Sequence, residues 1–408
     1  MAADGEDIQV MSSIVRDSSG RNYLVPFILV TSLFFLWGFA HGILDVLNKH
    51  FQDVLVISKA RSGLVQATVY GGYFLMALPA GRIIRRWGYR TGIVLGLVLY
   101  GIGALMFVPG ARLMSFPFFL LCLFVIGCGL TCLETSANPY ATVLGDRESA
   151  VRRLNLAQSF NGLGWIAGPL AGGLIILGED SDISLPYAVI GCVVLVLGLV
   201  FSRLRLPSVD TSDASPEDES GNTDRKSIWK VRTFRYGVPA LFFYVAAQTG
   251  INSFFINYVT EADSGIGPQT AALMLSFGGM GLFMAGRLLG TVIMEKLHPW
   301  KMILGCAAGA SVCMVLTILC GGTSGIAALC ATYLFESVMF PTIFSMALAD
   351  IRGESTKTAS SYLIMSIVGG AVSPVLMGLL GEARMSAGFV LPLMCFIFIA
   401  IYAATYKR

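Results

Sequence analysis

The feature that most constrains this sequence is a series of apolar stretches, each about as long as a membrane is thick. A helix needs about 20 mainly apolar residues to cross the hydrocarbon core of a bilayer. Only 13% of the 408 residues are charged, well below the roughly 25% that is usual in a soluble domain. The sequence therefore predicts an all-α polytopic membrane protein with twelve transmembrane helices, at approximately 24–47, 62–82, 90–109, 116–144, 154–178, 184–203, 235–259, 269–294, 301–321, 325–349, 358–381 and 387–405.

The positions of Lys and Arg predict the orientation, because short cytoplasmic loops carry an excess of these residues. With the N-terminus in the cytoplasm, 22 of the 28 Lys and Arg residues fall on the cytoplasmic side, and Arg287 lies within a span. We therefore expect a multi-pass protein of the plasma membrane, the inner membrane in a bacterium, with both termini cytoplasmic. The same asymmetry accounts for the net charge of +3, so no nucleic-acid partner is expected.

A polar run at 207–227, rich in Ser, Pro, Asp and Glu, separates two sets of six spans. Such a run contains too few apolar residues to fold alone. The two sets repeat each other weakly, since Glu134 and Glu336 each stand five residues before a proline, Pro139 and Pro341. Transporter folds are often built from repeats of this kind. We predict a cytoplasmic tail at 1–23, an N-terminal six-helix bundle at 24–205, a cytoplasmic linker at 206–233 and a C-terminal six-helix bundle at 234–408.

The first span carries a polar stripe in the sequence FLWGFAHGILDVLNKHF. Trp37, His41, Asp45 and Asn48 are 4, 4 and 3 residues apart, so they share one face of a helix. Ionisable residues in a membrane are tolerated mainly where they face a cavity or a partner. Asp45 is therefore either a wall of a substrate path or an interfacial residue at the end of the span. His41 is either a member of a proton relay or a hydrogen-bonded structural histidine.

The carboxyl of Glu134 lies well inside the fourth span, with Thr131 and Asn138 on the same face. A carboxyl in such an apolar setting can bind and release a proton near neutral pH, which a proton-coupled carrier requires. Its repeat-related partner Glu336 is either a second titrating site or the counter-ion of Arg287. The predicted proton-coupling residues are thus Asp45, Glu134 and His41. We expect no metal ligands in this sequence.

Neutral polar residues in the spans indicate the class of substrate. Amides present both donors and acceptors, which suits the hydroxyls of a sugar, and an aromatic ring suits its C–H face; hydrogen bonding between helices is the alternative. We predict substrate binding by Trp37, Asn138, Gln158, Asn161, Tyr244, Gln248, Asn252 and Glu336.

Several stretches together resemble a known family. After the second span, AGRIIRRWGYRTG is similar to the cytoplasmic loop signature of the major facilitator superfamily, although Arg85 stands where that signature has an aspartate. The sequences FLWGFAHGILDVLNKHF, CLETSANPYATVLG, RLNLAQSFNGLG, VAAQTG and FPTIFSMAL resemble the fucose:proton symporter family of that superfamily.

The resemblance implies two pseudo-symmetric six-helix bundles, a central cavity and alternating access. It also implies that Asp45 and Glu134 take part in proton coupling and that Gln158 and Asn161 line the cavity. The chain departs from the fucose pattern at His41, which leaves the identity of the sugar open.

The sequence thus predicts a proton-coupled symporter that imports a hexose, such as L-fucose, glucose or galactose. It is expected to act as a monomer in the lipid bilayer, without a cofactor, driven by a proton gradient. A sodium-coupled sugar symporter and an exporter of another small metabolite of the same fold are the alternatives. The sequence contains neither an HExxH motif nor a nucleophile elbow, so we do not expect an enzyme.

Overall fold

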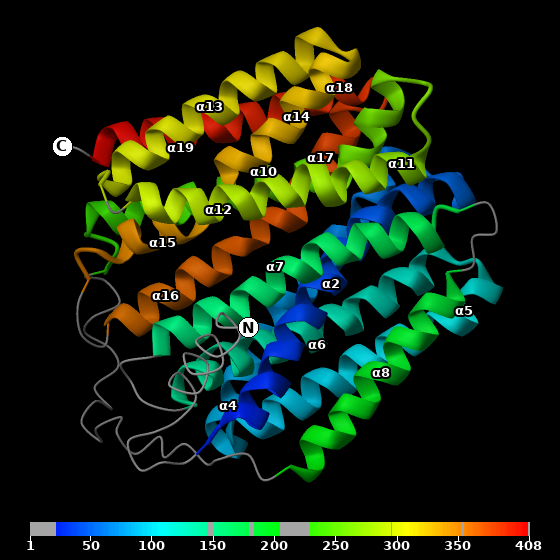
Figure 1. The fold of residues 1–408 in the computed structure, drawn as a ribbon, viewed down its shortest axis with the longest axis vertical. Coiled ribbons are helices and arrows are strands. Elements are labelled where there is room, and N and C mark those ends of the chain that lie inside the picture. Colours follow the sequence, from blue (N-terminus) through cyan, green and yellow to red (C-terminus); the bar gives the residue numbers. More distant parts are fainter. Residues whose placement is uncertain are drawn as a thin grey trace, which may run out of the picture. The chain divides into compact units, whose positions relative to one another are not determined.

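The computed structural model describes residues 22–144, 150–178, 183–204, 228–294, 296–351 and 355–406. All the elements within these ranges are helices, as Figure 1 shows. Most of the predicted tail at 1–23 and most of the predicted linker at 206–233 lie outside the described residues.

The described residues before the linker form seven helices. They are α2 (Leu24–Leu55), α3 (Lys59–Ser62), α4 (Leu64–Leu105), α5 (Phe107–Leu113), α6 (Phe116–Val143), α7 (Ala150–Ile175) and α8 (Ser184–Arg203). The part after the linker is more interrupted. It contains α10 (Arg232–Ala262), α11 (Pro268–Leu273), the π-helix η3 (Met274–Met280), α12 (Gly281–Met294), α13 (Pro299–Cys320), α14 (Gly322–Glu336), α15 (Met339–Leu348), α16 (Ser355–Met365), the 3₁₀-helix η4 (Ser366–Val368), α17 (Gly369–Leu380), α18 (Met385–Gly388) and α19 (Val390–Tyr406).

Each of the twelve predicted spans coincides with helix, which confirms the predicted fold class. Ten segments are long and apolar enough to cross a membrane by themselves. The two predicted spans missing from those ten are the first part of α4 and the whole of α7. Both contain polar side chains that face other helices, such as Gln66 in α4 and Asn161 in α7. In these two segments, low apolarity therefore reflects polar side chains that contact other helices.

The predicted loop between the second and third spans is shorter than expected. Helix continues through the basic segment on both sides of Gly88, and the break is a single residue with φ 80° and ψ 169°. A positive φ is accessible to glycine without steric cost. Gly88 is therefore the turn glycine of the sequence WGYR.

The second part of α4 packs closely against α6 through small residues. A Cβ atom on Gly129 would lie 2.6 Å from the backbone nitrogen of Tyr100, and one on Gly96 would lie 2.8 Å from the carbonyl oxygen of Gly129. Small residues at such crossings let helix backbones touch, which is how helices associate inside a membrane.

The described residues fall into two compact units. Unit 1 takes its residues from 1–43, 72–168 and 182–213, and unit 2 takes its residues from 44–71, 169–181 and 214–408. The last part of α2, the whole of α3 and the start of α4 therefore belong to unit 2, although they precede the linker in the sequence.

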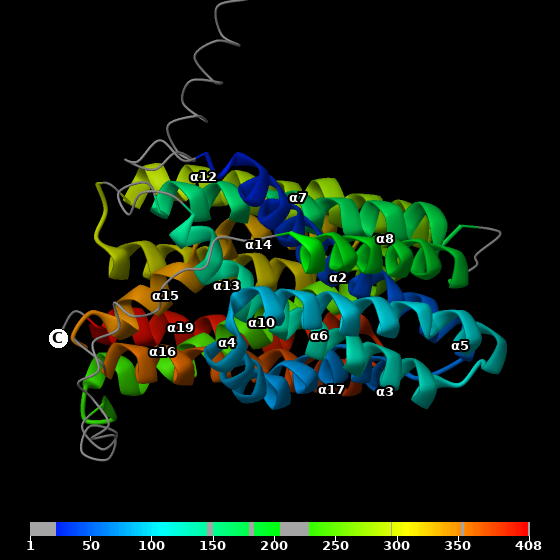
Figure 2. The same ribbon diagram turned by 90° about the horizontal axis from the view of Figure 1, so that it is seen from below.

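Helix α10 is the central element of unit 2. It packs against α15, α17 and α19, while α13 packs against α14 and α19, and Figure 1 shows α13 alongside the latter two. Figure 2 shows α12, α14 and α19 with roughly parallel axes. Almost every residue of α10 between Tyr244 and Val259 is buried, so polar residues on this helix face protein on all sides.

Candidate functional site

In unit 1, the polar stripe of α2 meets the hydroxyl of Tyr73 on α4. The indole Nε1 of Trp37 donates a hydrogen bond to the Tyr73 oxygen at 2.7 Å. The imidazole Nε2 of His41 lies 3.1 Å from the same oxygen. His41 is buried and its ring stacks on Trp165 of α7, with ring centroids 5.4 Å apart. Three helices therefore fix the position of His41.

Glu134 of α6 is part of the same group, because its carboxylate lies beside the Tyr73 side chain. The structure thus brings together Trp37, His41 and Glu134, which the sequence placed on two separate helices. Tyr73, which connects them, is absent from the sequence-based prediction.

A small pocket opens beside this group. Its wall is formed by α2 and α6, through Leu33, Phe34, Trp37, Leu133, Glu134, Ala137 and Asn138. The wall combines an indole, a carboxylate and an amide with apolar side chains. Such a wall can bind a small polar molecule with an apolar face, since a few placed polar groups among apolar ones are typical of ligand pockets.

The two predicted amides of α7 have different environments. Nε2 of Gln158 donates to Oδ1 of Asn138 at 3.2 Å, which places this amide pair next to the pocket. Nδ2 of Asn161 donates to the backbone oxygen of Phe34 at 3.1 Å, and Asn161 is buried. The Asn161 contact is a hydrogen bond between helices α7 and α2, of the kind that the sequence left open as an alternative.

In unit 2, Asp45 is 1% exposed and belongs to a second polar group. Its Oδ1 accepts a hydrogen bond from Nε2 of Gln66 at 2.9 Å, and its Oδ2 has no hydrogen-bond partner among the described residues. One turn further along α2, the Asn48 amide donates to the backbone oxygen of Ser253 on α10. A buried carboxylate oxygen without a donor is a place where a proton or a ligand can bind.

The predicted stripe on α10 contacts α14 at two of its three positions. The hydroxyl of Tyr244 donates to the backbone oxygen of Glu336 at 3.0 Å. Oδ1 of Asn252 accepts from the hydroxyl of Tyr333 at 2.8 Å. Gln248 is half-buried.

Glu336 itself is completely buried, and neither of its carboxylate oxygens has a hydrogen-bond partner among the described residues. The structure does not show the hydrogen-bonded ion pair with Arg287 that the sequence offered as one alternative. Nε of Arg287 instead lies 3.4 Å from the backbone oxygen of Ser337, and its guanidinium lies over the ring of Phe283.

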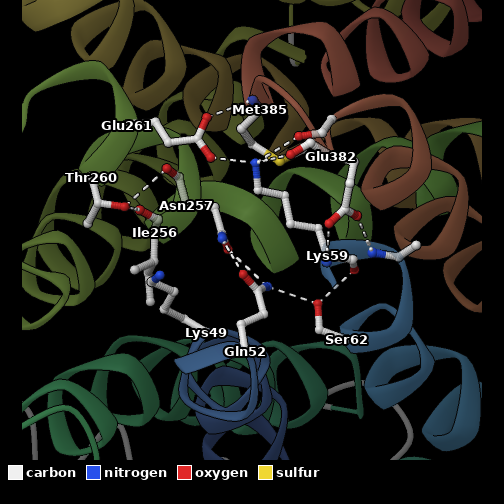
Figure 3. A network of polar contacts seen from close by, with 12 residues as sticks. Lys49, Gln52, Lys59, Ser62, Ile256, Asn257, Thr260, Glu261, Glu382 and Met385 are labelled. Carbon is white, nitrogen blue, oxygen red and sulfur yellow. Dashed lines mark hydrogen bonds and ion pairs between the residues drawn. The ribbon is translucent and has the colours of Figure 1, made fainter. Parts of the chain in front are cut away.

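A further polar network surrounds α3 in unit 2 (Figure 3). Nζ of Lys59 lies 2.5 Å from Oε1 of Glu261, at the end of α10, and 2.8 Å from the backbone oxygen of Gly381. The backbone nitrogens of Lys59 and Ala60 lie 3.4 and 3.3 Å from the carboxylate oxygens of Glu382. The network connects the segment between α2 and α4 to the ends of α10 and α17.

Comparison with known proteins places the chain in a family. The model of the Major Facilitator Superfamily matches residues 27–374. The chain belongs to this superfamily.

Full-length relatives within the superfamily are sugar transporters by name. The L-fucose-proton symporter of Escherichia coli is 35% identical over 94% of this chain and 93% of its own length. The glucose/galactose transporter of Brucella abortus is 34% identical over 94% of this chain and 95% of its own length. These similarities confirm the family resemblance predicted from the sequence.

Solved structures of the superfamily share the fold. FucP in its outward conformation matches with a TM-score of 0.70 and 34% identity, over 95% of this chain and 100% of FucP. A bacterial homologue of the human lysosomal transporter Spinster, inward-facing and occupied, matches with a TM-score of 0.74 at 16% identity, over 95% of this chain and 97% of the homologue. The second match supports the superfamily fold alone.

Three residues that contact predicted site residues are absent from the sequence-based prediction. Tyr73 contacts Trp37, Gln66 donates to Asp45, and Tyr333 donates to Asn252. A signal for the first two exists in the sequence, since Gln66, Tyr70 and Tyr73 are 4 and 3 residues apart and share a face of α4. Tyr70 is on the same face and accepts a hydrogen bond from Thr249 at 3.3 Å. For Tyr333 we find no comparable signal.

Proposed function

We propose that this superfamily member is a proton-coupled symporter that imports a hexose by alternating access. The observation that supports the proposal most is the position of Glu134, whose carboxylate lies beside Tyr73 and also lines the pocket with Trp37 and Asn138. A carboxyl group that can carry a proton, an indole and an amide are adjacent there. The names of the full-length relatives, an L-fucose-proton symporter and a glucose/galactose transporter, agree with this arrangement.

In the proposed cycle a proton enters from the outer side and binds the carboxylates of Asp45 and Glu134, with His41 as a neighbouring proton carrier. The proton gradient supplies the work, so no cofactor is required. An empty carrier with charged carboxylates does not change its orientation readily, because moving an ionised group within a low-dielectric interior is costly. Proton binding neutralises the carboxylates and therefore allows the carrier to reorient and move the sugar inward.

Each unit contains side chains to which we assign contacts with a sugar. In unit 1 they are Trp37, Asn138, Gln158 and Asn161, and in unit 2 they are Tyr244, Gln248, Asn252 and Glu336. The oxygens of Glu336, which have no hydrogen-bond partner among the described residues, favour a role in binding over a role in a structural ion pair. Ring stacking and amide hydrogen bonds are the interactions expected for a sugar.

The remaining assignments rest on the sequence. The distribution of Lys and Arg supports cytoplasmic termini, and we infer a monomer in the bacterial inner membrane. The polar run at 207–227 supports a division into two six-helix bundles, at 24–205 and 234–408, joined by the linker at 206–233.

Transport by purified protein in liposomes tests the proposal. Labelled L-fucose, D-glucose, D-galactose, D-mannose and N-acetylglucosamine are offered separately under an inward proton gradient or an inward sodium gradient. Accumulation of at least one hexose under the proton gradient, abolished by a protonophore, is expected. Accumulation under the sodium gradient alone would overturn proton coupling, and no accumulation of any of these sugars would overturn the assignment as a sugar symporter.

A further inference from the structure

The hydroxyl of Tyr73 is the point where three functional side chains of unit 1 meet. Trp37 donates to it at 2.7 Å, Nε2 of His41 lies 3.1 Å from it, and the carboxylate of Glu134 lies beside the same side chain. The three partners come from α2 and α6, while Tyr73 is on α4.

The hydrogen-bonding capacity of a hydroxyl determines the direction of these contacts. A tyrosine hydroxyl has one proton to donate and two lone pairs to accept with. The indole of Trp37 has only a donor, so this contact always occupies one lone pair. When Glu134 is ionised it accepts the single hydroxyl proton. The contact with His41 then requires a proton on Nε2, which donates to the second lone pair.

Protonation of Glu134 permits the opposite arrangement. A protonated carboxyl can donate to the Tyr73 oxygen, and both lone pairs are then filled by Trp37 and Glu134. In that arrangement the hydroxyl proton turns toward His41, whose Nε2 accepts and whose Nδ1 carries the ring proton. Proton transfer through Tyr73 to Glu134 therefore switches His41 between its two neutral tautomers.

We propose that Tyr73 is a positioning and proton-relay residue that connects His41 to Glu134. A proton binds to Nδ1 of His41, the Nε2 proton passes to the Tyr73 oxygen, and the Tyr73 proton passes to the Glu134 carboxylate. Tyr73 ends as a neutral hydroxyl, His41 ends as the neutral Nδ1 tautomer, and Glu134 has gained one proton. Reversal of these three steps releases the proton. The hydrogen bond from Trp37 holds the Tyr73 oxygen in place both when the proton is bound and when it is released. The inference rests on the proposed proton-coupled function.

Other groups also lie near this relay. Helix α7 contributes the ring of Trp165 against His41, and this ring has no proton that titrates in water. On α6, the thiol of Cys128 faces the backbone oxygen of Gly72, at 4.0 Å. His41 and Glu134 are the two titratable groups that the relay uses.

Tyr73→Phe tests the relay, because it removes the hydroxyl and keeps the ring. The matched control is Tyr89→Phe, on the same helix but outside this group. In liposomes, uphill accumulation under a proton gradient should fall by about tenfold or more, as expected for loss of a positioned proton-transfer group. Equilibrium exchange of labelled sugar should stay within a factor of about two, because exchange needs no net transfer of a proton. The increase of uptake with falling outside pH should also become flat in Tyr73→Phe.

The outcomes separate this inference from the proposed function. Wild-type protein without proton-driven accumulation would overturn the proposed function, whatever Tyr73→Phe does. Wild-type accumulation together with an unchanged pH profile in Tyr73→Phe would overturn the relay alone. Loss of exchange and accumulation in equal proportion would also overturn it, since that result indicates a role in sugar binding or packing.

A double-mutant cycle with His41→Leu provides a second measurement. The effects of substitutions along one proton-transfer path are not additive. Tyr73→Phe should therefore cause no further loss of accumulation in the His41→Leu background. Additive losses would contradict the relay. If Tyr73→Phe does not yield folded protein, Tyr73 is replaced by 3-fluorotyrosine, which keeps the hydroxyl but is a stronger acid. The relay then predicts a shifted pH profile of uptake, and an unshifted profile would overturn it.

Discussion

Nζ of Lys59 lies 2.5 Å from Oε1 of Glu261, and this ion pair joins α3 to the end of α10. The Lys59 side chain is 14% exposed and that of Glu261 is 37% exposed, so the pair is only partly screened by solvent. Glu261 is held from its other side, because its Oε2 accepts from the backbone nitrogen of Met385 at 2.7 Å. A transporter that opens at this end of unit 2 must separate α3 from α10 and α17.

We therefore predict that Lys59→Met favours conformations that are open at this end. Loss of a half-buried ion pair should shift the equilibrium by about 1 kcal/mol, which corresponds to roughly a fivefold change in population. Asn257→Cys reports on the opening, because Asn257 is 3% exposed and its amide contacts Gln52 in the same network. Its labelling by a membrane-impermeant thiol reagent, corrected for the native cysteines, should be severalfold faster in Lys59→Met.

Lys49→Met is the control for this measurement. The Lys49 side chain pairs with Asp53 at 2.8 Å within α2 itself, and the two side chains are 17% and 47% exposed. Breaking that pair disconnects no other helix, so labelling at position 257 should be unchanged. Equal labelling rates in both variants would show that the Lys59 pair does not hold this end closed.

Replacement of glycine by alanine should have opposite effects on stability at two positions of α7. A Cβ on Gly164 would lie 2.2 Å from the backbone oxygen of Phe35 and 2.6 Å from the backbone nitrogen of Phe39, whereas a Cβ on Gly162 would meet no atom within 4 Å. Gly164→Ala must push α7 away from α2, and overpacking of this kind costs about 1–3 kcal/mol. Gly162→Ala should be neutral or stabilising by up to about 1 kcal/mol through helix propensity.

Thermal unfolding of the detergent-solubilised protein checks this pair. The melting temperature of Gly164→Ala should be several degrees below that of Gly162→Ala. Both variants carry the same substitution on the same helix, so the comparison reports the contact that the added methyl group makes at each position. Equal melting temperatures would mean that α2 and α7 are not in close contact at Gly164.

Sequence periodicity predicted the helices and one face of each polar group, because the requirement for about 20 apolar residues and the 3.6-residue repeat are local properties. It identified His41, Asp45 and Glu134, since ionisable residues are rare inside a membrane. It did not identify Tyr73, because a tyrosine in an apolar helix is usually an aromatic packing residue. Only the tertiary structure shows that its hydroxyl lies beside Trp37.

The environment of Glu336 also depended on tertiary packing. The sequence left Glu336 open as either a second titrating site or the counter-ion of Arg287. Arg287 instead contacts the Ser337 carbonyl and the Phe283 ring, so the carboxylate of Glu336 is left without a hydrogen-bonding partner among the described residues. Which of two acceptors a long side chain reaches is set by rotamer and helix rotation, neither of which a single sequence specifies.

Two buried tyrosines of unit 2 differ in whether their hydroxyl has a partner. The hydroxyl of Tyr333 donates to Oδ1 of Asn252 at 2.8 Å, whereas the hydroxyl of Tyr402 has no partner among the described residues. Tyr333→Phe leaves a buried amide oxygen without its donor and should lower the free energy of unfolding by about 1–3 kcal/mol. Tyr402→Phe removes an unsatisfied group, so its melting temperature in detergent should be unchanged or higher. A lower melting temperature for Tyr402→Phe than for Tyr333→Phe would contradict the hydrogen bonding described for α10 and α14.

Substitution of the two carboxylates of Asp45 and Glu134 separates coupling from sugar binding. Glu134→Gln and Asp45→Asn keep the size of each side chain and one acceptor oxygen, but they replace the other oxygen with an NH2 donor and remove the group that ionises. Uphill accumulation under a proton gradient should be abolished in both variants, while sugar counterflow should be retained, because counterflow needs no net proton movement. Asp53→Asn, at an exposed carboxylate on α2 that pairs with Lys49, is the control and should accumulate sugar normally. Undiminished uphill uptake in both Glu134→Gln and Asp45→Asn would remove these carboxylates from the coupling mechanism, since no other step of the proposed cycle could then depend on their protonation.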